Sequence, residues 1–148
     1  MIKFTVTRQI NASLETVWEA LNDFGDIQRW NPSISKSELT TTGPVGKGST
    51  RHCDFKPLGG VNERIDVYEP NSRMTINLYE TFKLPISSAE ADFKIEARDG
   101  GTSLTLDYCY MPNPLGKLLK GTTDKQMRRG IEGLADSLLA ESEAMGVG

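Results

Sequence analysis

The N-terminal third of the chain changes from a two-residue to a helical hydrophobic period. Residues 2–7 alternate apolar and polar side chains, which predicts a half-buried β-strand. Apolar residues then recur with helical spacing over residues 14–21, directly after Ser13, a residue type that favours the N-cap position. A second short helical turn is predicted over residues 23–30, because Pro32 disfavours a helical conformation in the residue before it. The sequence therefore predicts one strand followed by two short helices.

From residue 34 onward the two-residue period returns and persists for about 75 positions. The alternation is interrupted by turn-forming runs at Gly43–Gly48, Pro57–Gly60 and Asp99–Gly101. Between these breaks the pattern predicts six strands, over residues 34–41, 49–56, 61–69, 73–82, 88–98 and 104–110.

The C-terminal part returns to helical spacing. Asn113-Pro114 is typical of a helix start, with proline suited to the first helical position. Apolar residues then recur at spacings of one, three, four, seven and eight, which predicts one long helix with a single apolar stripe: Leu115, Leu118, Leu119, Met127, Ile131, Leu134, Leu138 and Met145. Gly121, Gly130 and Gly133 each lower helix propensity by up to about 1 kcal/mol relative to alanine. This helix must therefore be stabilised by packing against the sheet.

These elements predict an α+β fold. Each strand has one apolar face, as expected of an antiparallel sheet that is covered on one side only. We expect a curved seven-stranded antiparallel sheet, two short helices after the first strand, and one long C-terminal helix across the sheet. A single helix cannot fill a strongly bent sheet, so the pattern also predicts a cavity between them. Residues 1–148 are expected to form one domain.

Charge, hydropathy and the few cysteine and histidine residues exclude several classes of protein and kinds of site. The net charge of −3 gives no overall positive field for nucleic acid. The chain shows neither a signal-peptide pattern nor an apolar run of about 18 residues, so we expect a cytoplasmic protein without stable membrane insertion. Cys53 and Cys109 do not suggest a disulfide framework. His52, the one histidine, excludes a histidine-clustered metal site and is expected on the polar face. No metal or cofactor is predicted, and a monomer is favoured.

Several segments resemble a known family when they are taken in order. They are Asn11–Leu21, Asp26–Pro32, Gly46–Arg51, Val61–Arg64, Leu84–Ile86 and Gly100–Leu104. Together they are similar to the polyketide cyclase/dehydrase and lipid-transport group of the START-like, birch-pollen-allergen-like helix-grip superfamily (SRPBCC). The resemblance implies a ligand cavity, with the loops Pro57–Gly60 and Leu84–Ser87 at its mouth. Because such proteins include carriers, hormone receptors and aromatase/cyclases, it does not decide the function.

Arg51 and Glu63 are the strongest candidates for polar groups in that cavity. Strand parity places both on the apolar face, and a hairpin folding around Leu58-Gly59 would put Cys53 opposite Glu63 with Arg51 diagonal to it. Two opposite charges on an apolar face should pair, since removing one partner of a buried pair costs roughly 3–5 kcal/mol. Such a pair could orient the polar end of a ligand. The alternatives are an ion pair at the rim, or a register that turns both residues to solvent.

Aromatic residues supply a second group of candidates. Tyr108 and Trp30 combine apolar area with one hydrogen-bonding group, which suits an aromatic or steroid-like ligand, although both could equally be core residues. The full set of predicted ligand-binding residues is Trp30, Arg51, Cys53, Phe55, Glu63, Ile65, Ile76, Leu78, Ala91, Phe93, Leu106, Tyr108, Met127 and Ile131.

Basic residues gather early in the long helix. They are Lys117, Lys120, Lys125, Arg128 and Arg129. Such a run is typical of a solvated helix face, and the alternative is docking to an acidic membrane surface.

Two functions fit these predictions. In the first, the protein is a carrier or sensor of a small, largely apolar molecule such as a lipid, a polyketide or a steroid-like compound. In the second, it is a cofactor-independent polyketide cyclase, dehydratase or isomerase. Arg51 would then stabilise charge, Glu63 would act as acid or base, and Tyr108 would donate a hydrogen bond. A groove for a partner's helix is a third, weaker alternative.

Overall fold

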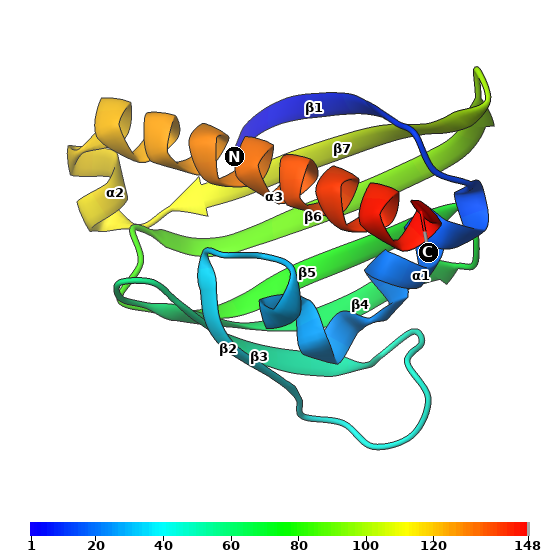
Figure 1. The fold of residues 1–148 in the computed structure, drawn as a ribbon. Helices are drawn as coiled ribbons and strands as arrows, with labels where there is room; N and C mark the ends of the chain where they lie inside the picture. The colour runs from blue at the N-terminus through cyan, green and yellow to red at the C-terminus, as the bar shows by residue number, and fades with distance from the viewer. Residues whose placement is uncertain (148) are drawn as a thin grey trace.

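The computed structural model describes residues 1–147 and has the predicted α+β architecture (Figure 1). Its helical elements are α1 (Leu14–Asn22), the 3-10 helix η1 (Phe24–Arg29), α2 (Pro114–Leu118) and α3 (Lys120–Val147). Its strands are β1 (Ile2–Ile10), β2 (Ile34–Leu39), β3 (Thr50–Phe55), β4 (Gly60–Glu69), β5 (Arg73–Phe82), β6 (Ile86–Arg98) and β7 (Gly101–Pro112).

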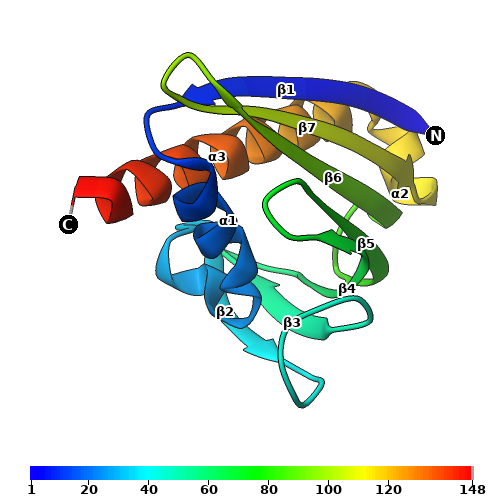
Figure 2. The same cartoon turned by 90° about the vertical axis from the view of Figure 1, so that its right-hand side faces the viewer.

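All seven strands form one antiparallel sheet in the order β1-β7-β6-β5-β4-β3-β2. The first strand therefore pairs with the last, and the strands between follow one another as hairpins. Figure 2 shows the sheet bending strongly, so that β1 and β2 lie far apart at its two edges. The curved seven-stranded sheet expected from the alternating pattern is confirmed.

The helices cover the two halves of the concave face separately. Helix α3 packs mainly against β1 and α1, and more lightly against β7, whereas η1 packs against β2 and β3. Two long-range hydrogen bonds hold α3 on its half: Tyr110 Oη donates to Asp124 Oδ1 at 2.7 Å, and Arg8 Nε donates to Asp136 Oδ1 at 2.7 Å. The centre of the sheet is therefore left between two helical layers.

Helix α1 begins where the sequence predicts. The Ser13 side chain caps it by accepting a hydrogen bond from the Thr16 backbone N–H at 3.2 Å. Val17 and Trp18 are buried, and the Trp18 ring meets Tyr68 edge-on with centroids 5.3 Å apart. Trp18 is thus a core residue.

The predicted single C-terminal helix is wrong in its first turns. Helix α2 ends at Leu118, and Leu119 leaves the helical conformation before α3 begins at Lys120. The reason lies at Gly116, the buried residue of α2, where an added Cβ would clash with the Pro85 carbonyl oxygen. Because α2 turns its glycine toward the sheet, its leucines do not continue the apolar stripe.

Two glycines of these helices should respond to alanine in opposite ways. Gly133 lies in α3 with open space around its Cβ position, so Gly133→Ala should raise the free energy of unfolding by about 0.5–1 kcal/mol through helix propensity. Gly116→Ala should lower it, since the new methyl group would push α2 away from Pro85. Urea denaturation of both variants checks this. Stabilisation by both substitutions would contradict the close contact at Gly116.

Candidate functional site

A cavity of about 330 Å³ lies between the centre of the sheet and the helices. Its walls come from η1, from β3 to β7 and from α3, with Glu63, Ile76, Phe93 and Tyr108 on the sheet side. Ile131 faces them from α3. A volume near the lower end of the 300–1,000 Å³ range of ligand sites suits a compact molecule.

Ten of the fourteen predicted ligand-binding residues line this cavity. They are Trp30, Arg51, Phe55, Glu63, Ile76, Ala91, Phe93, Tyr108, Met127 and Ile131. The other four are packed in the core away from the cavity wall: Cys53, Ile65, Leu78 and Leu106. Strand parity separates the concave face of the sheet from the convex one, but it does not separate the covered part of the concave face from the open part. For this reason the pattern could not exclude these four.

Loop residues form the rim of the cavity. Pro57 and Leu58 of the β3–β4 loop and Leu84 and Pro85 of the β5–β6 loop line it, and these are the two loops that the family resemblance places at the mouth. Polar lining residues that the hydrophobic pattern did not predict include Asn31, Ser33, Lys56 and Gln126. Residues 31–33 form a turn and Lys56 a loop, where no periodic pattern assigns a side chain to either face.

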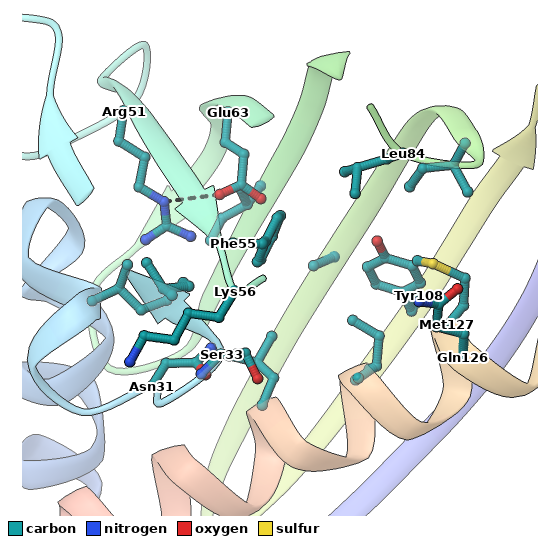
Figure 3. A pocket seen from close by; sticks show the side chains of 18 of the residues that line it. Asn31, Ser33, Arg51, Phe55, Lys56, Glu63, Leu84, Tyr108, Gln126 and Met127 are labelled. Atoms are coloured by element: carbon teal, nitrogen blue, oxygen red, sulfur yellow. Dashed lines mark hydrogen bonds and ion pairs between the residues drawn. The ribbon is translucent and has the colours of Figure 1, made fainter. Parts of the chain in front are cut away.

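Arg51 and Glu63 form an ion pair inside the cavity wall (Figure 3). Arg51 Nε lies 2.9 Å from Glu63 Oε1, and the two side chains are only 6% and 16% exposed. Arg51 also donates through Nη1 to the Phe24 carbonyl oxygen at 2.9 Å, and its guanidinium carbon lies 4.0 Å from the centre of the Phe24 ring. One arginine therefore joins β3 and β4 to η1.

The predicted register of this hairpin is wrong by two positions. Arg51 pairs directly with Glu63, and Cys53 pairs with Val61. The turn closes with a hydrogen bond from the Phe55 N–H to the Gly59 carbonyl oxygen at 2.8 Å, so its centre lies one residue earlier than Leu58-Gly59. In the observed register the Arg51 and Glu63 side chains lie directly opposite each other, and both remain on the concave face.

Tyr108 supplies a hydroxyl group at the other side of the cavity (Figure 3). Burial raises the pKa of Tyr108 above its ordinary value, and the nearby Glu63 carboxylate raises it further. The phenol therefore stays protonated at neutral pH and can donate a hydrogen bond. Within residues 1–147 its hydroxyl has no hydrogen-bond partner, and Figure 3 shows it directed into the cavity.

Trp30 carries a second donor without an acceptor. Its indole Nε1 is buried and has no hydrogen-bond partner in the described part of the chain. A buried unsatisfied donor costs about 1–3 kcal/mol. Trp30 also lines the cavity, but its Nε1 atom is itself buried and does not face the open space.

Neither Cys53 nor His52 has the features of a reactive residue. Burial raises the pKa of the Cys53 thiol to about 12, so little thiolate is present at neutral pH. His52 lies half-buried on the other face of the sheet and contacts Asn62 and Asp54 through its two ring nitrogens, at 2.7 and 2.8 Å. The hydrogen bond with Asn62 is the main cause that raises the pKa of His52. Among residues 1–147 no three or more His, Cys, Asp or Glu side chains form a group suited to a metal ion.

The sequence matches a family model over residues 1–143, and that family is described as polyketide cyclase / dehydrase and lipid transport. The chain belongs to this family. An uncharacterized protein of Mycobacterium tuberculosis, Rv2574, is 29% identical over 104 residues, which cover 69% of this chain and 61% of that protein. The chain thus matches less than two thirds of the length of this curated relative.

Solved structures with low sequence identity share the family's helix-grip fold. TTHA0849 from Thermus thermophilus matches with a TM-score of 0.82 and 17% identity, covering 97% of this chain and 99% of that one. Ara h 8.0201 matches with a TM-score of 0.76 and 14% identity, over 97% and 98% of the two chains. The di-domain ARO/CYC StfQ from the steffimycin biosynthetic pathway matches with a TM-score of 0.80 and 13% identity, over 98% of this chain and 50% of StfQ.

Removal of one ion-pair partner should destabilise the protein more than removal of both. Arg51→Met leaves the Glu63 carboxylate without its partner, and we expect the free energy of unfolding to fall by about 3–5 kcal/mol. The double variant Arg51→Met/Glu63→Leu should recover most of this loss, since no uncompensated charge remains. Chemical denaturation of the two variants measures both effects. A single variant within about 1 kcal/mol of the unmodified protein would show that the pair carries little energy.

Proposed function

We propose that the protein binds a small, largely apolar molecule in the cavity and releases it unchanged, as a carrier or sensor. The observation that carries this proposal is a cavity of about 330 Å³ whose wall combines apolar side chains with a few polar groups. That combination is typical of sites in which apolar surface gives affinity and a few polar atoms fix orientation. The family description, which includes lipid transport, agrees with it.

The polar groups indicate the kind of molecule. The Tyr108 hydroxyl points into the cavity and has no partner among the described residues, so the ligand should present at least one acceptor, such as a carbonyl or ether oxygen. The Arg51 guanidinium is already engaged by Glu63 and by the Phe24 carbonyl oxygen, which leaves it less free to bind a full anion. A neutral polyketide-like or steroid-like molecule therefore fits better than a fatty acid.

A matched pair of glycines tests the location of the ligand. Gly130 and Gly133 both lie in α3 with open space around their Cβ positions, but only Gly130 lines the cavity. We expect Gly130→Leu to weaken binding of the uncharged fluorophore N-phenyl-1-naphthylamine at least fivefold, and Gly133→Leu to leave it unchanged. Fluorescence titration measures both. Failure of the unmodified protein to bind the fluorophore, or equal losses in both variants, would count against binding in this cavity.

Tyr108→Phe tests the hydrogen bond alone. Loss of the hydroxyl should weaken 2-acetylnaphthalene binding about five- to tenfold, which corresponds to about 1 kcal/mol. Binding of 2-ethylnaphthalene, which has a similar shape but no acceptor, should not change. Because burial raises the pKa of Tyr108, the difference should persist from pH 6 to pH 9. Calorimetry with both ligands gives the comparison, and equal effects on the two would remove Tyr108 as the donor.

The second candidate is a cyclase or dehydratase that acts on a polyketide-like substrate in the same cavity. It is favoured by one observation, namely that Glu63 receives its bonds from Arg51 and Cys53 through Oε1 and lies across the cavity from a protonated tyrosine. A carboxylate and a phenol so placed could move a proton and polarise a carbonyl. The two functions differ in whether the bound molecule is recovered unchanged, which mass spectrometry of incubated substrate decides.

A further inference from the structure

Helix α2 and the residue that follows it expose three large apolar side chains to solvent. Leu115, Leu118 and Leu119 are 58%, 80% and 49% exposed, although they lie within five residues of one another. The helix contributes only Gly116 to the protein interior. Single exposed leucines are common on protein surfaces, but a cluster of this kind points to an interaction site.

The leucines of α2 adjoin the mouth of the cavity. Asn113 ties the start of α2 to the β5–β6 loop, because its Nδ2 donates to the Leu84 carbonyl oxygen at 2.7 Å and its backbone N–H to the Pro85 carbonyl oxygen at 3.0 Å. The Leu84 side chain in turn lies against Gly59 of the β3–β4 loop, where Leu58 is 59% exposed. In Figure 1 these two loops and α2 lie together at one end of the molecule.

The two loops and α2 carry charges of one sign. Lys56 and Lys83 lie in the two loops, and Lys117 and Lys120 flank the exposed leucines. All four lysines are exposed, and neither loop nor the segment 111–123 contains an acidic residue. The chain as a whole carries a net charge of −3, whereas these segments carry only positively charged side chains.

Exposed apolar side chains with lysines beside them match the surface of an anionic bilayer. Leucines can enter the boundary between headgroups and acyl chains while lysines remain at the charged headgroups. A second copy of this chain is a poorer occupant, since it would bring lysines against lysines. The contact is peripheral, because across residues 1–147 no helix combines the length and the apolar character that crossing a bilayer requires.

We propose that α2, together with the β3–β4 and β5–β6 loops, is a docking surface for anionic membranes. Docked in this way, the protein holds the cavity mouth against the lipid. An apolar molecule could then pass between bilayer and cavity without crossing water. The proposal goes beyond ligand binding, and membrane attachment can be measured whether or not the cavity is occupied.

Vesicle sedimentation of the full chain tests this docking surface. Vesicles of phosphatidylcholine with 30% phosphatidylserine should bind the protein at least tenfold more strongly than vesicles of phosphatidylcholine alone. Added salt should weaken the binding by screening the lysines. Leu115→Ser/Leu118→Ser and Lys117→Glu/Lys120→Glu should each reduce binding at least tenfold. All four side chains are exposed, so these variants should keep the stability of the unmodified protein.

Matched controls lie elsewhere on the surface. Tyr79 is an exposed aromatic residue of β5, and Lys36 and Lys47 are exposed lysines of β2 and the β2–β3 loop. Tyr79→Ser and Lys36→Glu/Lys47→Glu should leave vesicle binding within twofold of the unmodified protein. If vesicle binding by the control variants falls as far as binding by the α2 variants, the assignment to α2 is overturned. It is also overturned if the unmodified protein does not bind anionic vesicles. A dimer that Leu115→Ser/Leu118→Ser disperses, with no vesicle binding, would assign the surface to a second copy.

Discussion

The concave face of the sheet presents more apolar surface than the helices bury. Helix α3 is held over β1 and β7 by the bonds from Tyr110 and Arg8, and η1 is held over β2 and β3. Neither of these two layers packs closely on β4, β5 or β6, and the cavity lies there. Since buried apolar surface normally excludes water by close packing, this open stretch explains why the protein has a cavity, and why the cavity wall is mostly apolar.

The Arg51–Glu63 ion pair gives this apolar space its polarity. Arg51 joins three elements by bonding Glu63 across the hairpin and the Phe24 carbonyl oxygen in η1, so the side of the cavity formed by η1 depends on a charge that ligand binding can also use. A buried ion pair is weak evidence for stability, since its desolvation offsets its attraction. Its position in the cavity wall, with the Tyr108 hydroxyl on the other side of the same cavity, is what supports the proposed role in ligand orientation.

The strands could be predicted from the two-residue period of the sequence. The register of the β3–β4 hairpin and the break between α2 and α3 could not. The alternation that begins at Ile2 and returns at Ile34 predicted all seven strands, because a sheet with one covered face imposes a strict two-residue period. The β3–β4 register was wrong because the turn closes between Phe55 and Gly59, a local geometry that hydrophobicity does not encode. The leucines of α2 were assigned to the core since their spacing fits the stripe of α3. The non-helical residue Leu119 separates α2 from α3, so the leucines of α2 do not lie on the apolar face of α3. The break arises from the packing of Gly116 against Pro85.

The central claim, that the space under the bent sheet accepts a guest molecule, can be tested by methyl NMR during a titration with 2-acetylnaphthalene. The methyl groups of Ile76, Met127 and Ile131 line the cavity, whereas those of Ile10, Ile65 and Leu104 are fully buried away from it. The account predicts saturable shifts in the first group and almost none in the second. Unchanged spectra at saturating ligand, or shifts of equal size in both groups, would contradict it.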